Sequence, residues 1–325
     1  SSGYFKNQGV DVMAFDDIYP EGHQGGVCII MNGHRVATNG DIRLEATPGQ
    51  WQPVPKQLDR KLGDNSITAT LCYPDSSRHL TGFNPMIYPD LHLIYTVNVE
   101  SKGKNIEVTV DLDRPIPQEF IGKVGFNLEF FPGSLFGKPW IMDGQSGIFP
   151  QQPNSPLMTT QPNYLHTGNY HDGKKSLADM DKLIGKGYSP IVADDIISEP
   201  YAKGTKFTSR PDDPYNKVTI ESLSGDLQLF DGRMNHNNGW FVLRSNIKPG
   251  VTKGAVKWII TPNVVADWMY QPVIQTSQIG YHPTQDKEAV IEMDIRDNRK
   301  ETAQIIRIDA DGEKVVKNVT PANWG

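Results

Sequence analysis

Apolar and polar residues alternate along much of the first part of the chain. Residues 93–100 and 106–113 flank a short turn at 101–104, and in each segment every second side chain is apolar. Successive side chains of a strand point to opposite faces, so this pattern predicts a β-hairpin with one buried and one polar face. Residues 41–46 show the same alternation, which indicates an antiparallel sheet.

Two Asn-Gly pairs are candidate turn positions within this first region. Asn32-Gly33 and Asn39-Gly40 each combine residues that tolerate positive φ, and Asn-Gly is a preferred pair for tight hairpin turns. We therefore expect a reversal of the chain at both places.

A second group of strand-like segments follows later in the chain. It consists of residues 217–221, 226–230, 240–244 and 255–260, separated by turns rich in Gly and Asn. Two groups of antiparallel strands with few helices predict an all-β fold, namely a large antiparallel β-sandwich.

Residues 132–215 interrupt the alternation between these two groups. The segment is rich in Pro, Gly and Asn, and only residues 176–184 have helical spacing, after a capping Ser176. We expect a long irregular insertion here, and such insertions are more often functional or in contact with a partner than idle.

The pattern changes again near residue 263. Residues 263–272 contain Trp268 and Tyr270 and read as a packed linker, and strand alternation resumes at 287–296. Residues 304–308 and 313–316 predict a further hairpin around an Asp-Gly-containing turn. The expected organisation is a β-sandwich domain over 1–262, the linker, and a second β domain over 273–325.

Composition excludes some classes of partner. The 325 residues are enough for about two domains, and the net charge of −6 provides no electrostatic reason to bind nucleic acid. No apolar run approaches the roughly 20 residues that a membrane-spanning helix needs. The chain begins Ser-Ser-Gly without Met, which fits a removed export signal and equally fits residues added by cloning.

The two cysteines leave the compartment open. Cys28 and Cys72 each lie in an apolar, strand-like run. An exported protein could bridge them if their strands were adjacent, and two buried free thiols are an equally good interpretation.

Two segments carry a resemblance to a known family. The string Gln-Ile-Gly-Tyr-His-Pro at 278–283 resembles the first strand of the immunoglobulin-like domain that precedes the catalytic barrel of glycoside hydrolase family 9. Residues 124–133 and 140–150 look like the extra N-terminal domain of some secreted bacterial members. An immunoglobulin-like sandwich needs about 100 residues. Residues 273–325 would therefore be the first part of an incomplete immunoglobulin-like β-sandwich.

The resemblance implies an exported enzyme, periplasmic, extracellular or lipid-anchored, that hydrolyses β-1,4-linked glucans with inversion. In this family the base comes from an Asp-Ala-Gly-Asp string and the acid from a Glu in a helical barrel, and neither occurs in this chain. We therefore expect a non-catalytic segment with no catalytic residue, cofactor or metal. Its expected partners are its own catalytic domain and a β-glucan.

Aromatic residues are the best candidates for contacting a sugar. They are Trp140, Phe149, Tyr164, Tyr170 and Trp240, which lie among Asn, Gln and Gly residues that can hydrogen-bond hydroxyl groups. The alternative is that these rings anchor the insertion or pack against the catalytic domain.

The other polar candidates are better explained by structural roles than by catalysis or metal binding. Adjacent carboxylates occur at 16–17, 194–195 and 212–213, and neighbours on an extended chain tend to point apart, so turn or capping roles are expected. His166, His171 and Asp172 share one loop, and imidazole with carboxylate can hold a divalent metal. Nothing in the sequence fixes their spacing, so surface positions are the preferred interpretation.

Two rival functions remain open. One is a free-standing carbohydrate-binding protein, and the other is an enzyme of mutarotase-like or lyase-like fold with its site in the sandwich itself. A helical continuation containing Asp-Ala-Gly-Asp would favour the glucanase hypothesis over both.

Overall fold

The computed structural model describes residues 4–7, 9–16, 25–45, 47–48, 53–81, 88, 91–153, 157–158, 197–234, 239–299 and 301–324. The chain divides into two compact units, Ser1–Ala266 and Asp267–Gly325. The division falls inside the segment 263–272 that the sequence suggests as a linker.

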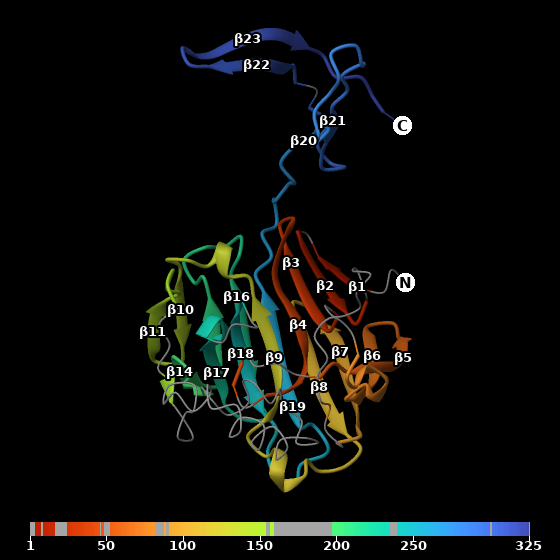
Figure 1. Ribbon diagram of the computed structural model, residues 1–325, viewed down its shortest axis with the longest axis vertical. Helices are drawn as coiled ribbons and strands as arrows, with labels where there is room; N and C mark the ends of the chain where they lie inside the picture. The colour runs from red at the N-terminus through yellow and green to blue at the C-terminus, as the bar shows by residue number, and fades with distance from the viewer. Residues whose placement is uncertain are drawn as a thin grey trace, which may run out of the picture. The chain divides into compact units, whose positions relative to one another are not determined.

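The first unit is a β-sandwich made of two antiparallel sheets (Figure 1). Among the described residues the first sheet has eight strands, in the order β1 (Tyr4–Asn7), β2 (Val10–Ala14), β3 (Val27–Met31), β4 (His34–Leu44), β9 (Val124–Phe130), β18 (Phe241–Asn246), β17 (Leu227–Asp231) and β14 (Ala202–Gly204). The central strands β4, β9 and β18 thus come from three distant parts of the sequence.

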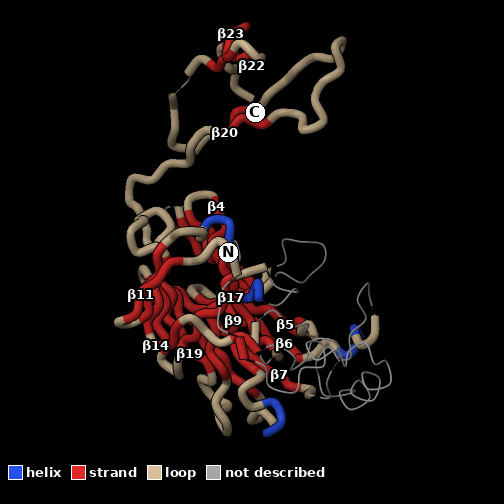
Figure 2. Tube along the Cα trace, turned by 60° about the vertical axis from the view of Figure 1, so that its left-hand side comes forward, coloured by secondary structure: helices blue, strands red, loops and turns tan. Residues whose placement is uncertain are grey.

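The second sheet has nine strands within the described part of the chain. Their order is β11 (Gln145–Ile148), β10 (Pro139–Met142), β15 (Lys206–Ser209), β16 (Val218–Ser222), β19 (Val256–Pro262), β8 (Asn105–Leu112), β7 (Leu93–Lys102), β6 (Ser66–Tyr73) and β5 (Lys56–Leu62). Figure 2 shows how strands (red) make up most of this unit, with few helical turns (blue). The all-β prediction is confirmed.

Alternation along the strands builds the core between the two sheets. The predicted hairpin is present as β7 and β8, and the inward-facing Leu93, Val97 and Val99 of β7 are fully buried. Phe126 of the eight-stranded sheet meets Trp258 of the nine-stranded sheet edge to face, with ring centroids 5.0 Å apart. The buried apolar face is therefore continuous across both layers.

The two Asn-Gly pairs behave differently. Asn32 and Gly33 have φ of 52° and 79° and form the turn between β3 and β4, as predicted. Asn39 also has positive φ, 56°, yet it lies within β4, where the register with β9 shifts between Thr38 and Asp41. The expected second turn is instead a β-bulge, because residues 41–44 continue to pair with β9.

The insertion expected at 132–215 is only partly irregular. Its described ends contain β10, β11 and β15 at one edge of the nine-stranded sheet, and β14 at an edge of the other. Strands of three or four residues between Pro and Gly are too short to show alternation in the sequence. The described part also contains a short pair, β12 (Leu157–Met158) with β13 (Ile197–Ser198). The predicted helix at 176–184 lies outside the described residues.

The second unit contains two separate strand pairs. β20 (Val273–Gln275) pairs with β21 (Val290–Glu292), and β22 (Ala303–Asp309) forms the predicted hairpin with β23 (Gly312–Val319). None of the described residues 267–324 is buried. Large apolar side chains are exposed along it, including Ile274, Ile279, Ile295, Ile305, Ile308, Val315 and Trp324.

The cysteines are not bridged. Cys28 lies on β3 of the eight-stranded sheet and Cys72 on β6 of the nine-stranded sheet, and both are free thiols. Their inward-facing neighbours, Ile29 and Leu71, are buried in the core. The two thiols therefore sit on opposite outer faces of the sandwich, which excludes a bridge between them.

In the described part of the chain, no helix has the length and apolar character needed to cross a membrane.

Candidate functional site

Charged side chains gather on the outer face of the eight-stranded sheet, where β4, β9 and β18 lie side by side. Ile42, Leu44, Phe126 and Leu128 point into the core, so alternation places the residues between them on the opposite face. This charge cluster consists of Asp41, Arg43, Glu45, Asn127, Glu129 and Arg244, and each member is at most 9% exposed.

Arg244 is the central group of the charge cluster. Its guanidinium donates to Glu45 Oε1 at 3.3 Å and to Asn127 Oδ1 at 3.2 Å, and Asn127 in turn donates to Glu45 at 2.6 Å. It also donates to the backbone carbonyls of Glu45 and Lys123, both at 3.0 Å. Arg244 thereby joins three chain segments through charge-assisted hydrogen bonds.

A glycine makes room for this guanidinium. Gly125 of β9 pairs with Asn246, next to Arg244 on β18. A Cβ at residue 125 would lie 2.7 Å from Arg244 Nε and 2.9 Å from the carbonyl oxygen of Ser245. Only a residue without Cβ lets the side chain of Arg244 pass across the backbone at this distance.

Two phenols of the nine-stranded sheet reach the end of β4. Tyr95 donates to Asp41 Oδ1 at 2.8 Å, and Tyr73 donates to the carbonyl oxygen of Pro53 and accepts from the amide of Leu44. Among the described pairings, β3 accompanies β4 only as far as Gly40. The hydroxyl groups therefore bond where the edge of β4 is otherwise open.

Burial shifts the carboxyl groups toward their protonated forms. It raises the pKa of Asp41 to about 6, against the opposing effects of Arg43, the Tyr95 hydroxyl and the Ile42 amide. It raises the pKa of Glu45 to about 7, opposed by Arg244 and Arg43 and assisted by the nearby Glu129. Three carboxyl groups face two guanidinium groups in the charge cluster, so one bound proton balances their charge.

At the β-bulge, a residue with positive φ and a buried polar atom without a partner in the described part of the chain lie beside these carboxyl groups. Asn39 donates to Glu129 Oε2 at 2.6 Å from its positive-φ position. Asn39 Oδ1 is buried and has no hydrogen-bond partner among the described residues. A positive φ, an orphaned polar atom and raised carboxyl pKa values together are typical of functional sites.

Chemically, the charge cluster contains two carboxyl groups whose pKa values are raised toward neutral pH. Carboxyl groups with pKa values of about 6 and 7 are partly protonated there, as general acid–base catalysis requires. Within the described residues no group of three or more His, Cys, Asp or Glu side chains is placed to hold a metal ion. The cluster is therefore a candidate for proton chemistry or for structural charge pairing.

Of the three predicted sugar-contacting aromatics that the structure describes, two lie in the core. Trp140 is 6% exposed and Phe149 is fully buried, so neither ring presents a face to a ligand, which favours the packing alternative. Trp240 is half-buried, with its ring edge to face against Phe131 at 4.4 Å. Tyr164 and Tyr170 lie outside the described residues. The five rings are therefore not shown to form one sugar-binding surface.

Phe149 packs against Phe241, with ring centroids 4.8 Å apart, next to contacts made by Arg233 at the end of β17. Arg233 pairs with the buried Asp231 at 2.9 Å, donates to the carbonyls of Pro150 and Gln151 at 2.8 Å, and lies 4.6 Å from the ring centroid of Phe241. These contacts hold residues 150–151, which lie within the expected insertion, against the sheet. Their role is structural.

Of the weaker polar candidates, Asp213 has the expected turn role, and Asp16 instead forms an ion pair. Asp213 accepts hydrogen bonds within its own loop, from the amide of Tyr215 and the side chain of Asn216. Asp16 pairs with Arg60 at 3.8 Å. The pair at 194–195 and the loop with His166, His171 and Asp172 lie outside the described residues.

The charge cluster is difficult to predict from the sequence. Charged residues alternate with apolar ones along 41–45, and the same holds for Asn127 and Glu129, but such alternation is expected of any strand with a wet face. The sequence does not show that these strand faces are buried, or that Arg244 lies on a neighbouring strand. A strand with three charges and an Asn-Gly pair inside it is the available signal.

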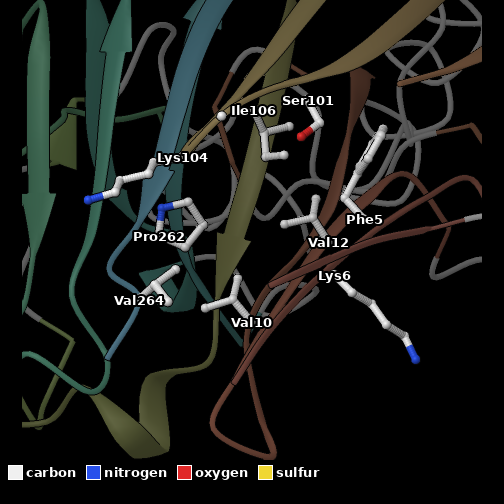
Figure 3. A pocket seen from close by; sticks show the side chains of 10 residues that line it. Phe5, Lys6, Val10, Val12, Ser101, Lys104, Ile106, Pro262 and Val264 are labelled. Carbon is white, nitrogen blue, oxygen red and sulfur yellow. The ribbon is translucent and has the colours of Figure 1, made fainter. Parts of the chain in front are cut away.

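A narrow notch lies at one end of the first unit (Figure 3). Phe5, Val10 and Val12 of β1 and β2 face Ile106, Pro262 and Val264 across it. Its volume of about 50 Å³ holds one or two water molecules, far below the roughly 300 Å³ of the smallest common ligand pockets. The notch is not a sugar site.

Comparison with known proteins does not assign a family. No family model matches the chain, and no curated protein matches it. Family 9 membership therefore stays a prediction.

Some solved structures align with the chain at low similarity. A galactose mutarotase-like protein from Lactobacillus casei aligns over 79% of this chain and 98% of its own, with 12% identity and a TM-score of 0.38. A protein from Synechocystis sp. PCC 6803 aligns over 80% and 95%, with 10% identity and a TM-score of 0.32. A heparan sulfate lyase from Pedobacter heparinus aligns over 97% and 40%, with 11% identity and a TM-score of 0.30. Such distant likenesses assign no activity to this chain.

Proposed function

We propose that this chain is the non-catalytic N-terminal part of an exported family 9 glycoside hydrolase that degrades β-1,4-linked glucans. The observation that carries the proposal is the second unit, which contains the string at 278–283 and has no buried residue in its described part. Two isolated strand pairs with exposed Ile and Val need further strands or a partner surface for stability. The remaining strands of an immunoglobulin-like domain, followed by a catalytic barrel, would supply that surface.

The proposal is tested on the native protein, isolated from its source organism. Peptide sequencing and intact-mass measurement of the native protein should find a continuation with a helical pattern and an Asp-Ala-Gly-Asp string. The full protein should release reducing ends from a soluble β-glucan, whereas residues 1–325 alone should release none. Robust hydrolysis by residues 1–325 would refute the proposal, as would a native protein that ends at residue 325.

A second candidate is a sugar-converting enzyme with its site in the sandwich. The charge cluster favours it, because the pKa values of Asp41 and Glu45, about 6 and 7, suit an acid–base pair. Neither the notch nor the cleft described below is lined by Asp41 or Glu45, so this candidate also needs a path for substrate. The first proposal requires no such path.

Two assays separate this candidate from the first. Polarimetry would detect interconversion of sugar anomers, and ultraviolet absorbance would detect the unsaturated product of a lyase acting on uronate-containing polysaccharides. If the candidate is correct, the wild type exceeds the buffer rate and Glu45→Gln returns it to that rate. Wild-type rates equal to buffer in both assays would eliminate it.

A further inference from the structure

A larger cleft lies between three loops at one end of the first unit. The tip of the β3–β4 hairpin, the helical turn η3 (Pro132–Ser134) and the loop after β15 enclose about 520 Å³, within the roughly 300–1,000 Å³ typical of small-ligand sites. Its described lining has two guanidinium groups, one imidazole and no carboxylate. The residues used below are Arg35, Phe131, Ser134, Arg210 and Asn216.

Arg210 is held in a fixed position at the edge of the cleft. Its backbone has φ of 51°, and its amide donates to the carbonyl of Pro139 at 3.0 Å. Its guanidinium pairs with Asp213 and donates to the carbonyl of Ser134 at 3.4 Å. Its Nε is buried and has no hydrogen-bond acceptor among the described residues. A buried N–H without an acceptor is costly, and in native proteins it commonly meets water or a ligand.

The carboxylate of Asp213 forms hydrogen bonds within its own loop and does not line the cleft. It accepts from the amide of Tyr215 at 2.9 Å and from Asn216 Nδ2 at 3.1 Å. Burial alone would raise its pKa, but the hydrogen bond from Asn216, the Tyr215 amide and the charge of Arg210 together lower it. Asp213 therefore stays ionised and fixes Arg210 and Asn216 in place.

Further hydrogen bonds fix the walls of the cleft. Asn32 at the hairpin tip donates to the carbonyl of Tyr215, and Asn263 donates to the carbonyl of Pro214 at 2.7 Å. The ring of Phe131 is oriented by its edge-to-face contact with Trp240. The cleft is thus formed before any ligand arrives, which lowers the entropic cost of binding.

We propose that this cleft binds the carboxylate of an acidic sugar, such as a uronic acid unit of a polysaccharide. Guanidinium groups match a planar carboxylate in geometry and charge, and the orphaned Arg210 Nε is a donor suited to one of its oxygens after a small adjustment of the side chain. The half-buried Phe131 ring can lie against the sugar, while Asn216 and Ser134 can bond its hydroxyls. This ligand differs from the neutral glucan of the proposed function, and the inference does not depend on it.

The decisive comparison uses D-glucuronate and D-glucose, which differ only at C6. Calorimetric titration at constant ionic strength should show glucuronate binding at least tenfold more tightly than glucose, with inorganic sulfate as a competitor of lower affinity. Equal binding of the two sugars, or no binding of glucuronate, would overturn the proposal. Sulfate binding as tightly as glucuronate would also overturn it, since the sugar ring would then contribute nothing.

Variants locate the binding to the cleft. Arg210→Gln and Arg35→Gln should each weaken glucuronate binding about tenfold or more, which corresponds to about 1.4 kcal/mol. Arg78→Gln is the matched control, because Arg78 lies in the separate turn η1 (Ser76–Arg78) and is 56% exposed. Unchanged affinity in both cleft variants, with circular dichroism as the check of folding, would contradict the assignment. The wild-type sugar comparison stands even where a variant fails to fold.

Discussion

At the scale of single residues, Arg244 is the group on which the charge cluster depends. It is 1% exposed and lies 3.3 Å from Glu45, which is fully buried. A buried ion pair of this kind contributes little net stability, but removing one partner leaves the other charge uncompensated. The cluster is therefore sensitive to the loss of either side chain.

Arg244→Met should destabilise the protein by about 3–5 kcal/mol, because Glu45 and Asn127 lose their buried donor. Urea denaturation followed by circular dichroism measures the change. Arg78→Met is the control, because Arg78 is 56% exposed and its pair with Asp75 is long, at 4.0 Å, which predicts a loss below about 1 kcal/mol. Equal destabilisation by the two substitutions would show that the cluster is not buried as described.

Glu45 also predicts a pH dependence. Its folded-state pKa, about 7, lies above its ordinary value of 4.5, so the folded protein binds this proton more tightly than the unfolded chain. Its contribution to stability is complete below about pH 4.5 and is lost as the pH rises through about 7. Glu45→Gln should therefore remove a decline of about 2.5 kcal/mol in the free energy of unfolding between pH 5 and pH 8. Identical pH profiles for wild type and variant would contradict the raised pKa.

At the scale of elements, the hairpin of β10 and β11 shows how a short strand pair is stabilised by one aromatic ring. Gly147 pairs with Trp140 across the hairpin, and a Cβ at residue 147 would collide with the indole. Gly144 lies in the turn of the same hairpin, and a Cβ there would have no neighbour within 4 Å. The two glycines thus differ in packing while sharing one element.

Gly147→Ala should displace Trp140 and destabilise the hairpin by about 1–3 kcal/mol, the range for overpacking. Hydrogen exchange of amides 140–148 reports this locally, and faster exchange is expected in Gly147→Ala than in the wild type. The matched variant Gly144→Ala should exchange like the wild type. Equal behaviour of both variants would show that the indole can move aside without cost.

At the scale of the whole molecule, the two units differ in how much apolar surface they bury. The first unit has a continuous core between its sheets, whereas the described residues of the second unit have no buried side chain. Local stability follows buried contacts, so the two units should open independently.

Hydrogen exchange across the chain tests this difference. Amides of β7 and β8 should be strongly protected, and those of β22 and β23 should exchange orders of magnitude faster. In a longer native protein that supplies the remaining strands, β22 and β23 should become protected. Equal protection of both units in residues 1–325 would show that the second unit is stable by itself.

The sequence by itself determined most strands, the Asn32-Gly33 turn and the hairpin of β22 and β23, because strand alternation and turn preference are local properties. Tertiary structure decided the rest. The bulge at Asn39 follows from continued pairing of β4 with β9, and the separation of Cys28 from Cys72 follows from the assignment of their strands to different sheets. The charge cluster arises because β4, β9 and β18 are neighbours, and the cleft arises because three distant loops meet. Period-2 alternation determines which side chains share a face of a strand, whereas long-range strand pairing determines which residues contact that face.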